Sequence, residues 1–518
     1  MDKRLPLVLT LDFGTQSLRA ALTNDKGDIE NIFKVKYEPA YYSESYGYAE
    51  QDADYYWECA VKALKGIADE APDKLERISG AAITTFRDTS VQLDANNKPL
   101  RRSILWLDQR LAKGKEKLPL LHWFLFSLIG MKPTIVLNRA RTVAHWLKEN
   151  EPETWNKTVK YVNISTYITY KLTNNLVDSS ASITGHYPIN FKKRKWYNVN
   201  HIKARIFGIP QRMLCELKQP GEVLGTIKDD LADEVGLPRG IKVYATGSDK
   251  ACETIGLGAL NNEIGAISYG TASTIEVSNQ KYHEPEPFLP AYGAAVPNWY
   301  NMEVQIYRGY WMLTWFTKEF ANDLAPKAKG ELTIEGILNT KLGSIPPGSN
   351  GLIVQPYWGP GLSRPLARGA VIGFSDIHTR DHLYKAIIEG IAYSLREGLE
   401  GIEKSQRHKI KELRISGGGS QSDDICQITA DIFGLPVSRV QTYETTSLGA
   451  SISVFLATGR FASIEEATNA MSHKGKTFYP NEVAHKQYDF LYKNVYVKMY
   501  PQLKGVYKDI NKFSKREV

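Results

Sequence analysis

The chain has 518 residues, too many for one ordinary hydrophobic core, so two large domains are expected. Its composition, 42% apolar and 24% charged, is that of a globular protein and excludes extensive disorder. The formal charge of +8 is small for this length and the basic residues are scattered, so we expect no nucleic-acid partner.

The four cysteines are far apart and form no Cys-x-x-Cys pair, which predicts neither a zinc site nor disulfides and favours a cytoplasmic location. The apolar run at the N-terminus stops at Asp12, so no signal peptide is expected. The most membrane-like stretch, Leu118 to Met131, is shorter than the ~20 residues of a spanning helix. We expect no membrane contact and interpret this stretch as a buried helix or a subunit contact.

The first predicted element is a hairpin of two strands at 7–11 and 18–23, joined by a polar, glycine-bearing bend. Apolar spacing then predicts a helix over 54–70 and a strand over 78–84.

The bend of this hairpin carries groups that suit a nucleotide phosphate. Gly14 lets a phosphate approach the backbone, Thr15 and Ser17 offer hydroxyl groups, and Arg19 adds a fixed positive charge. Asp12, at the end of the strand, could hold a hydrated Mg²⁺ ion. Taken alone, the motif could equally be an ordinary β-turn.

Polar groups that suit a polyol follow the strand at 78–84. Arg87 supplies several hydrogen-bond donors, and the adjacent Asp88 supplies an acceptor. Trp106 adds an aromatic surface close to further polar residues. The alternative for each charged pair, taken singly, is a surface ion pair.

Asp249 is the candidate general base. A predicted strand over 241–246 delivers it to the domain boundary, where it could accept a proton from a hydroxyl that attacks a γ-phosphate. A helix cap is the alternative for a lone aspartate at this position. Because the segment after Asp249 is rich in glycine, we divide the chain into domains at 1–257 and 258–480, followed by a charged helical tail at 481–518.

The second half repeats the hairpin pattern, with strands on either side of Gly270-Thr271, which predicts a weak internal duplication. A third glycine-rich site, 416–420, lies between a predicted strand and a helix that carries Asp423 in its first turn. Its glycines allow close approach of a nucleotide, although a simple tight turn is the alternative. Further helices are predicted over 380–403 and 423–433. The chain has no Gly-x-Gly-x-x-Gly fingerprint and no complete Walker A loop, which disfavours a dehydrogenase and a P-loop ATPase.

Taken in order, these segments resemble the FGGY carbohydrate kinases from Asp12 to about Gly459. The most specific match is to the family's second signature motif, which covers residues 369–374 and, after a spacer of the expected length, residues 382–389. Of the family's first signature motif, only the C-terminal part is matched, at residues 146–150. The resemblance implies an α/β fold of two actin-like, ribonuclease-H-type domains that close over a cleft. It also implies ATP and Mg²⁺ as cofactors, and it allows a homodimer or tetramer.

The resemblance also assigns roles to individual residues. Asp12 would serve Mg²⁺, and Asp249 would be the general base. The nucleotide would be contacted by Thr15, Gln16, Ser17, Arg19, Thr271, Gly418, Gly419 and Asp423, the last of which stands where glycerol kinases carry asparagine.

The substrate implied is a small sugar or polyol. Arg87-Asp88 resembles the Arg-Glu pair with which glycerol kinases hold their triol, Trp106 also matches them, and the Gln-Met-His-Gly run of xylulokinases is absent. Lys250 replaces the glutamine that follows the base, which suggests that Lys250 contacts the substrate and favours a larger or anionic one. We expect a polyol or ketose kinase from the glycerol-kinase-like side of the family, but not a clear glycerol kinase.

Two other interpretations stay open at this point. An actin-like ATPase would share the phosphate hairpins but would hydrolyse ATP without a sugar. A sugar-binding regulator that has lost catalysis would have no need of both Asp12 and Asp249.

Overall fold

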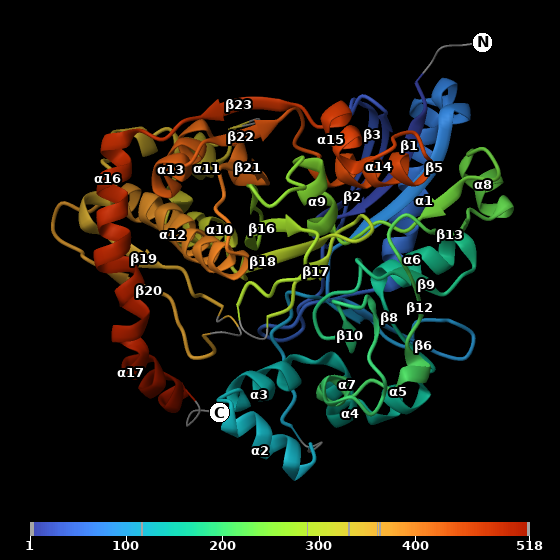
Figure 1. The fold of residues 1–518 in the computed structure, drawn as a ribbon, viewed down its shortest axis with the longest axis horizontal. Helices are drawn as coiled ribbons and strands as arrows, with labels where there is room; N and C mark the ends of the chain where they lie inside the picture. Colours follow the sequence, from blue (N-terminus) through green and yellow to red (C-terminus); the bar gives the residue numbers. More distant parts are fainter. Residues whose placement is uncertain are drawn as a thin grey trace.

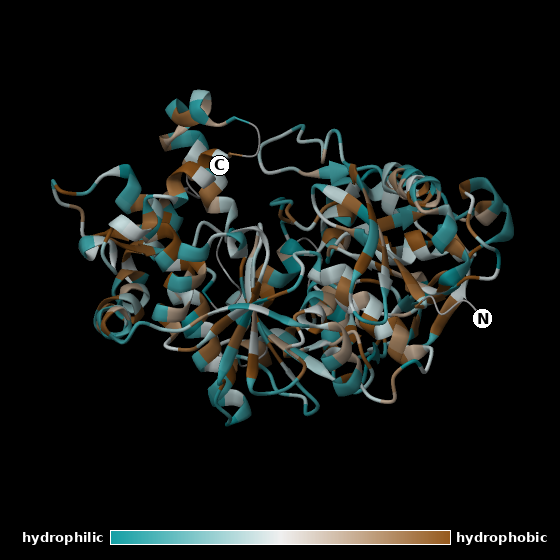
Figure 2. Ribbon diagram, turned by 90° about the horizontal axis from the view of Figure 1, so that it is seen from above, coloured by the Kyte–Doolittle hydropathy of each residue, from teal (hydrophilic) through white to brown (hydrophobic). Residues whose placement is uncertain are grey.

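The computed structural model describes residues 5–114, 118–286, 289–329, 332–359, 361 and 364–514 and shows two α/β domains side by side. Each domain is built on a central sheet, and helices cover the faces of both sheets (Figure 1). Hydrophobic residues gather along the strands in the middle of the molecule, and hydrophilic residues dominate the periphery (Figure 2).

The sheet of the first domain contains six strands within the described residues, in the order β13-β14-β5-β1-β2-β3. β1, β2 and β3 pair antiparallel, whereas β5 and β14 run parallel to β1 and to each other. The strands are β1 (Leu7–Phe13), β2 (Ser17–Asn24), β3 (Ile29–Lys36), β5 (Ile78–Thr85), β13 (Val223–Thr226) and β14 (Lys242–Tyr244).

The sheet of the second domain has the same core topology. Its order within the described part of the chain is β17-β18-β16-β15-β21-β22-β23, with β15, β16 and β18 antiparallel and with β21 and β22 parallel to β15. The strands are β15 (Ile264–Tyr269), β16 (Ser273–Asn279), β17 (Tyr292–Gly293), β18 (Tyr300–Ile306), β21 (Glu412–Ser416), β22 (Val437–Val440) and β23 (Lys474–Phe478). The internal duplication predicted from the two hairpins is therefore a real repeat of topology.

The predicted helices are present close to their expected limits. α1 (Ala53–Glu70) contacts β2 and β3, and α12 (Arg380–Gln406) contacts β16 and β18. The others that cover the sheets are α6 (Ile164–Thr173), α8 (Asp229–Val235), α13 (Asp423–Phe433) and α15 (Ile464–Met471). The two-domain α/β fold class predicted from the sequence is confirmed.

Two helices pack closely where the domains meet. α9 (Asp249–Gly256) and α14 (Thr445–Ala457) approach through glycine, because a Cβ at Gly256 would lie 1.9 Å from the Thr445 carbonyl oxygen and one at Gly449 would lie 1.8 Å from that of Cys252. α14 also contacts β1 and β5 of the first sheet. A side chain at either glycine would force the helices apart, so the close contact of α9 with α14 requires glycine at both positions.

The first domain also carries a group of short elements away from its sheet. A small sheet contains β4 (Glu50–Gln51), β6 (Ser90–Leu93), β7 (Ser103–Ile104) and β8 (Lys160–Asn163). The helices are α2 (Leu120–Leu128), α3 (Lys132–Arg141), α4 (Val143–Asn150), α5 (Pro152–Lys157) and α7 (Ile202–Phe207).

The interpretation of 118–131 as a buried helix is wrong. The stretch does form a helix, α2, but none of the residues of that helix is buried. Its subunit-contact alternative stays a prediction. Across the described residues, no helix combines the length and the apolar character that crossing a membrane requires.

The C-terminal segment packs on the second domain. α16 (Glu482–Leu491) continues through a π-helical turn (Tyr492–Tyr496) into α17 (Val497–Ser514). The Tyr492 and Tyr496 rings lie 5.9 and 5.2 Å from the ring of Tyr393 on α12. The domain limits at 1–257, 258–480 and 481–518 stay predictions.

Candidate active site

The end of β1 places Asp12 beside the predicted phosphate-binding bend. Asp12 pairs in register with Arg19 on β2 and with Thr84 on β5, and its Oδ2 lies 3.7 Å from Arg19 Nη1. Arg19 Nε lies 2.8 Å from a carboxylate oxygen of Glu444, just before α14. Burial raises the pKa of Asp12 to about 7, although the charge of Arg19 opposes the shift.

This environment fits a bound cation. A buried carboxylate whose pKa is raised so far regains its ordinary acidity when a divalent ion supplies positive charge. Among the described residues, no three His, Cys, Asp or Glu side chains form a metal-binding group. Mg²⁺ typically binds through one or two carboxylates and completes its shell with water and phosphate oxygens.

Arg87 lies just beyond the end of β5 and forms a bidentate ion pair with Glu303 on β18 of the second domain. Its Nη1 and Nη2 donate to the two carboxylate oxygens at 2.6 and 2.9 Å. The guanidinium also lies 5.6 Å from the centre of the Tyr292 ring, and its Nε is 4.0 Å from Asp249 Oδ1. Burial alone would lower the pKa of Arg87, but Glu303 raises it well above its ordinary value.

Asp88 is held by His186. The backbone N–H of His186 donates to Asp88 Oδ1 at 3.0 Å, and its Nδ1 lies 2.6 Å from Asp88 Oδ2. Asp88 takes a left-handed conformation, with φ at 52°, which turns its side chain toward Gly185 and His186. Although burial opposes the shift, His186 lowers the pKa of Asp88 below its ordinary value.

Asp249 is the first residue of α9, after the N-cap Ser248. Its Oδ1 accepts a hydrogen bond from the backbone N–H of Lys250 at 2.8 Å, while the side chain stays 27% exposed. Burial raises the pKa of Asp249 despite the opposing charges of Arg87 and Lys250. A partly exposed carboxylate with a raised pKa has the properties of a proton acceptor.

The side chain of Lys250 turns into the protein. Its Nζ donates to Glu253 Oε2 at 2.6 Å and to the Ser268 hydroxyl at 2.5 Å. The other oxygen of Glu253 accepts from Ser268 at 2.9 Å and from Ser416 at 2.6 Å. The charge of Lys250 is therefore balanced by a buried carboxylate, and its ammonium group lies beside β15 of the second domain.

Trp106 lies beside the phosphate-binding bend. Its indole Nε1 donates to the Thr15 hydroxyl at 3.4 Å, and its backbone N–H donates to the Thr89 hydroxyl at 3.2 Å. Thr15 is half-buried, Gln16 is exposed and Ser17 is buried. The segment expected to hold a sugar and the segment expected to hold phosphate are thus in direct contact.

The predicted nucleotide residues of the second domain differ in accessibility. Thr271 is exposed at the β15–β16 turn, and a Cβ at Gly418 would meet nothing within 4 Å. Gly419 is buried, and a Cβ there would lie 2.3 Å from the Tyr310 ring. Asp423, in the first turn of α13, forms ion pairs with Lys476 and, at 2.7 Å, with Arg439.

Sequence reasoning missed three acidic or basic residues of this region: Glu303, His186 and Glu276. Glu276 on β16 lies directly opposite Glu303 on β18, and its Oε2 accepts from the Thr254 hydroxyl and from the Asn301 amide. Burial, with the neighbouring Glu303, raises the pKa of Glu276 well above its ordinary value. These are single residues on strands or loops, and no local motif marks them.

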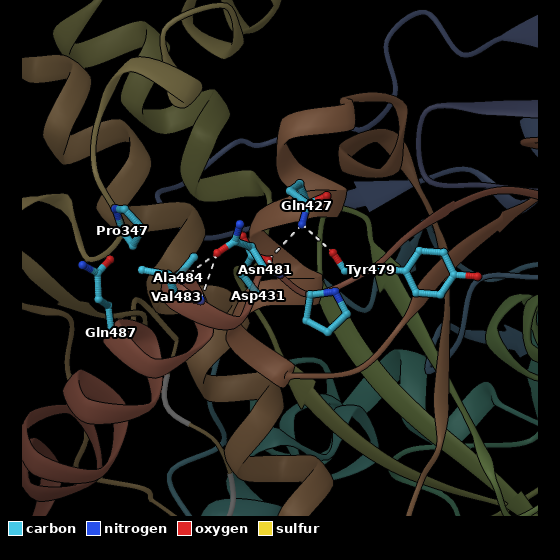
Figure 3. Close-up of a pocket in the computed structure, with 9 residues that line it drawn as sticks. Pro347, Gln427, Asp431, Tyr479, Asn481, Val483, Ala484 and Gln487 are labelled. Carbon is cyan, nitrogen blue, oxygen red and sulfur yellow. Dashed lines mark hydrogen bonds between the residues drawn. The ribbon is translucent and has the colours of Figure 1, made fainter.

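A pocket of about 760 Å³ lies elsewhere, between α13 and α16 (Figure 3). Asp431, which lines it, accepts hydrogen bonds from the Gln427 amide at 2.9 Å and from the Asn481 backbone at 2.7 Å. Its lining includes none of the residues predicted to form the site.

The fold and the site together define a two-domain carbohydrate kinase. The chain belongs to the FGGY family of carbohydrate kinases: residues 7–256 match the family's N-terminal domain and residues 265–458 its C-terminal domain. It is therefore an enzyme that transfers a phosphoryl group to an alcohol group of a carbohydrate.

Several known proteins resemble nearly the whole chain. It is 29% identical to a xylulose kinase of Lactococcus lactis, over 98% of this chain and 97% of the relative. It is 28% identical to a glycerol kinase of Thermococcus gammatolerans, over 89% of this chain and 90% of the relative. The crystal structure of a ligand-bound xylulose kinase from Lactobacillus acidophilus superposes with a TM-score of 0.82 at 21% identity, covering 98% of this chain and all of the other. The chain is almost equally similar to a xylulose kinase and to a glycerol kinase. Sequence identity therefore does not identify its substrate class within the family.

Proposed function

We propose that this kinase transfers the γ-phosphoryl group of Mg-ATP to a hydroxyl group of a small sugar or polyol, with Asp249 as the general base. The observation that carries the proposal is the position of Asp249, a partly exposed carboxylate at the start of α9, 4.0 Å from the sugar-site candidate Arg87. The substrate oxygen forms a bond to the γ-phosphorus, the bond to the bridging oxygen breaks, and ADP leaves. Asp249 accepts the hydroxyl proton.

The phosphates would lie between the two hairpin turns. We assign Mg²⁺ to Asp12, a buried carboxylate at the end of β1 beside the phosphate-binding bend. When bound, the ion would neutralise charge on the phosphate oxygens. The contacts to the nucleotide are assigned to Thr15, Gln16, Ser17 and Arg19 from the first domain and to Thr271, Gly418, Gly419 and Asp423 from the second.

Gly418 is the strongest of the second-domain assignments, because the space beside it is open. Gly419 can contribute only its backbone, since Tyr310 fills the space next to its Cα. Asp423 is engaged by Lys476 and Arg439, so it would act through those two cations more than through its own oxygens.

We assign the sugar to Arg87, Asp88 and Trp106. Arg87 Nε remains directed toward Asp249 while the other two nitrogens bind Glu303, which suits a hydroxyl bound between the guanidinium and the base. Lys250 is better described as a residue that positions Asp249 and β15, because its charge is already balanced by Glu253. A neutral polyol or ketose fits this charge balance, and the xylulose and glycerol kinases among the relatives support the same class.

The test is ADP release with Mg-ATP across a panel of neutral polyols, ketoses, aldoses and sugar acids. The proposal predicts strong turnover with one neutral compound and little ATP hydrolysis without it. Rapid ADP release without any sugar would instead indicate an actin-like ATPase. Sugar binding without turnover in the presence of Mg-ATP would indicate a regulator.

A further inference from the structure

Asp88 and His186 form a closed pair beside the residues assigned to the sugar. The backbone N–H of His186 donates to one carboxylate oxygen of Asp88 and its Nδ1 lies 2.6 Å from the other, so a single residue engages both oxygens. The preceding Gly185 packs directly against the carboxylate, because a Cβ there would lie 2.3 Å from Asp88 Cγ. Asp88 and His186 are 98 residues apart in the chain, so the tertiary structure makes this contact and a local turn does not.

Both sides of this contact use an unusual backbone conformation. Asp88 has a φ of 52° and Gly185 a φ of 78°, in the left-handed region that residues other than glycine seldom adopt. Such conformations persist where the surrounding structure holds them, and they gather at sites that bind ligands. A side chain at position 185 would displace the carboxylate, so both segments are built to keep Asp88 in this place.

The geometry of the pair also assigns the proton on the imidazole ring. An ionised carboxylate only accepts hydrogen bonds, so Nδ1 of His186, which faces Asp88, is the donor. In the neutral ring the other nitrogen, Nε2, is then an acceptor. Nε2 forms no hydrogen bond within the described residues and is not one of the buried atoms that lack a partner, so it is open to solvent. The side chains of His186 and Asp88 are 19% and 28% exposed, which leaves both able to contact a ligand.

The pair lies next to Arg87 and approaches tyrosines of the second domain. Burial is the main cause of the raised pKa of Tyr292 and of Tyr307, and the negative charge of Asp88 adds to the shift in both. The guanidinium of Arg87 lies 5.6 Å from the centre of the Tyr292 ring, and its Nε is 4.0 Å from Asp249 Oδ1. A sugar held between Arg87 and Asp249 would therefore have Asp88 as a neighbour.

We propose that Asp88 and His186 act as one acceptor unit for two hydroxyl groups of the sugar other than the one that is phosphorylated. His186 is a positioning residue for Asp88, and it also accepts a hydrogen bond at Nε2. A carboxylate offers about four lone-pair sites, so Asp88 can accept from the sugar while His186 holds it. The inference rests on the proposed function, because it concerns the sugar of that reaction.

This arrangement restricts the class of substrate. Both members of the unit accept hydrogen bonds, so they select a sugar that presents hydroxyl donors at this end. A substrate with a carboxylate at this end has no proton to donate and would be repelled by the charge of Asp88. A site built to bind a hydroxyl group strongly rejects an analogue that lacks it, because its own polar groups are then left unpaired.

Two substitutions separate the two roles of His186. His186→Asn keeps an amide donor where Nδ1 stands but has no atom at the position of Nε2, whereas His186→Leu removes both groups. In His186→Asn the KM for the best sugar is expected to rise about tenfold with kcat nearly unchanged, and in His186→Leu about tenfold further, because Asp88 is no longer held. The affinity for ATP should match that of wild type in both variants, which a general loss of structure would not allow.

His201→Asn is the matched control. His201 caps the N-terminus of α7 outside the site, and asparagine is itself a good cap, so the KM for the sugar should not change. If the wild type phosphorylates a sugar and His186→Asn has the same KM, this inference fails while the proposed function stands. If the wild type shows no sugar-dependent ADP release, both fail together.

Deoxy analogues of the best sugar identify the hydroxyl group that is bound at Nε2. Wild type is expected to bind one analogue about tenfold more weakly than the parent sugar, whereas His186→Asn should bind that analogue and the parent about equally, because the contact is already missing. If every analogue loses affinity by the same factor in both proteins, Nε2 contacts no hydroxyl group and the proposal is overturned.

Discussion

Arg87 and Glu303, which are 216 residues apart in the chain, form a two-pronged ion pair between the two domains. Arg87 follows β5 of the first sheet, and Glu303 lies on β18 of the second. The side chains are 14% and 4% exposed, so the pair is shielded from solvent. The proposed sugar site is thus tied directly to the relative position of the two domains.

Removing one member of this pair should destabilise the protein. Glu303→Ala leaves the Arg87 guanidinium buried without its main partner, which is expected to lower the free energy of unfolding by about 3–5 kcal/mol. The double substitution Arg87→Met with Glu303→Met should recover most of this loss in stability while lowering, but not abolishing, sugar-dependent turnover. Denaturant unfolding of Arg87→Met, Glu303→Met and the double variant gives the coupling energy between the two side chains. Additive effects of the two substitutions would contradict a direct interaction.

Lys250 should matter for stability more than for sugar preference. Lys250→Gln leaves Glu253 buried without its ammonium partner, so a loss of about 2–4 kcal/mol in unfolding free energy is expected. Lys250→Gln with Glu253→Gln should be closer to wild type, because no buried charge is left alone. The order of substrates in the panel should stay the same. A changed order of preferred substrates would instead support the prediction, made from the sequence, that Lys250 determines substrate specificity.

The open space beside Gly418 gives a direct test of the nucleotide assignment. Gly418→Ala adds a methyl group where no protein atom lies within 4 Å, so the fold should tolerate it. If ATP passes close to this backbone, its affinity should fall about tenfold, or about 1.4 kcal/mol. Gly505→Ala, which is equally free of contacts but lies on α17, is the control and should leave ATP binding unchanged. Equal affinities of both variants, measured by calorimetry, would remove Gly418 from the site.

Activity should fall at acid pH through Asp249. Burial raises the pKa of this carboxyl above the ordinary value of 3.8, and a general base works only when it is ionised. The acid limb of kcat/KM should therefore lie above pH 3.8. Arg87 lowers the pKa of Asp249, so Arg87→Met should move the limb to higher pH. A limb that stays at the same pH in a folded, active variant would show that another group controls it.

Much of the fold could be predicted from local patterns. Both hairpins, the strand that precedes Asp249, and the helices α1, α12 and α13 follow from apolar periodicity and turn residues, which act over a few residues. The partners of the charged residues could not be predicted in this way. Glu303 and His186 meet Arg87 and Asp88 only because distant strands and loops are brought together, and a single residue on a strand carries no periodic signal.

The error over 118–131 has a related cause. An apolar run predicts burial, but it does not say what covers the residues. In this structure Trp123 and Phe126 pack on the first domain, whereas Leu120, Phe124 and Leu128 are mostly exposed. An apolar run in the sequence is therefore not sufficient to predict a place in the core.

The central claim is that Asp249 accepts the proton of the attacking hydroxyl. The most direct measurement compares wild type and Asp249→Asn with the best sugar, as turnover and as ATP affinity in the same preparation. Turnover is predicted to fall by roughly 10²–10⁴-fold, because asparagine preserves the shape of the site but cannot take a proton, while ATP still binds. Turnover within twofold of wild type, in a variant that melts at the wild-type temperature, would contradict the account.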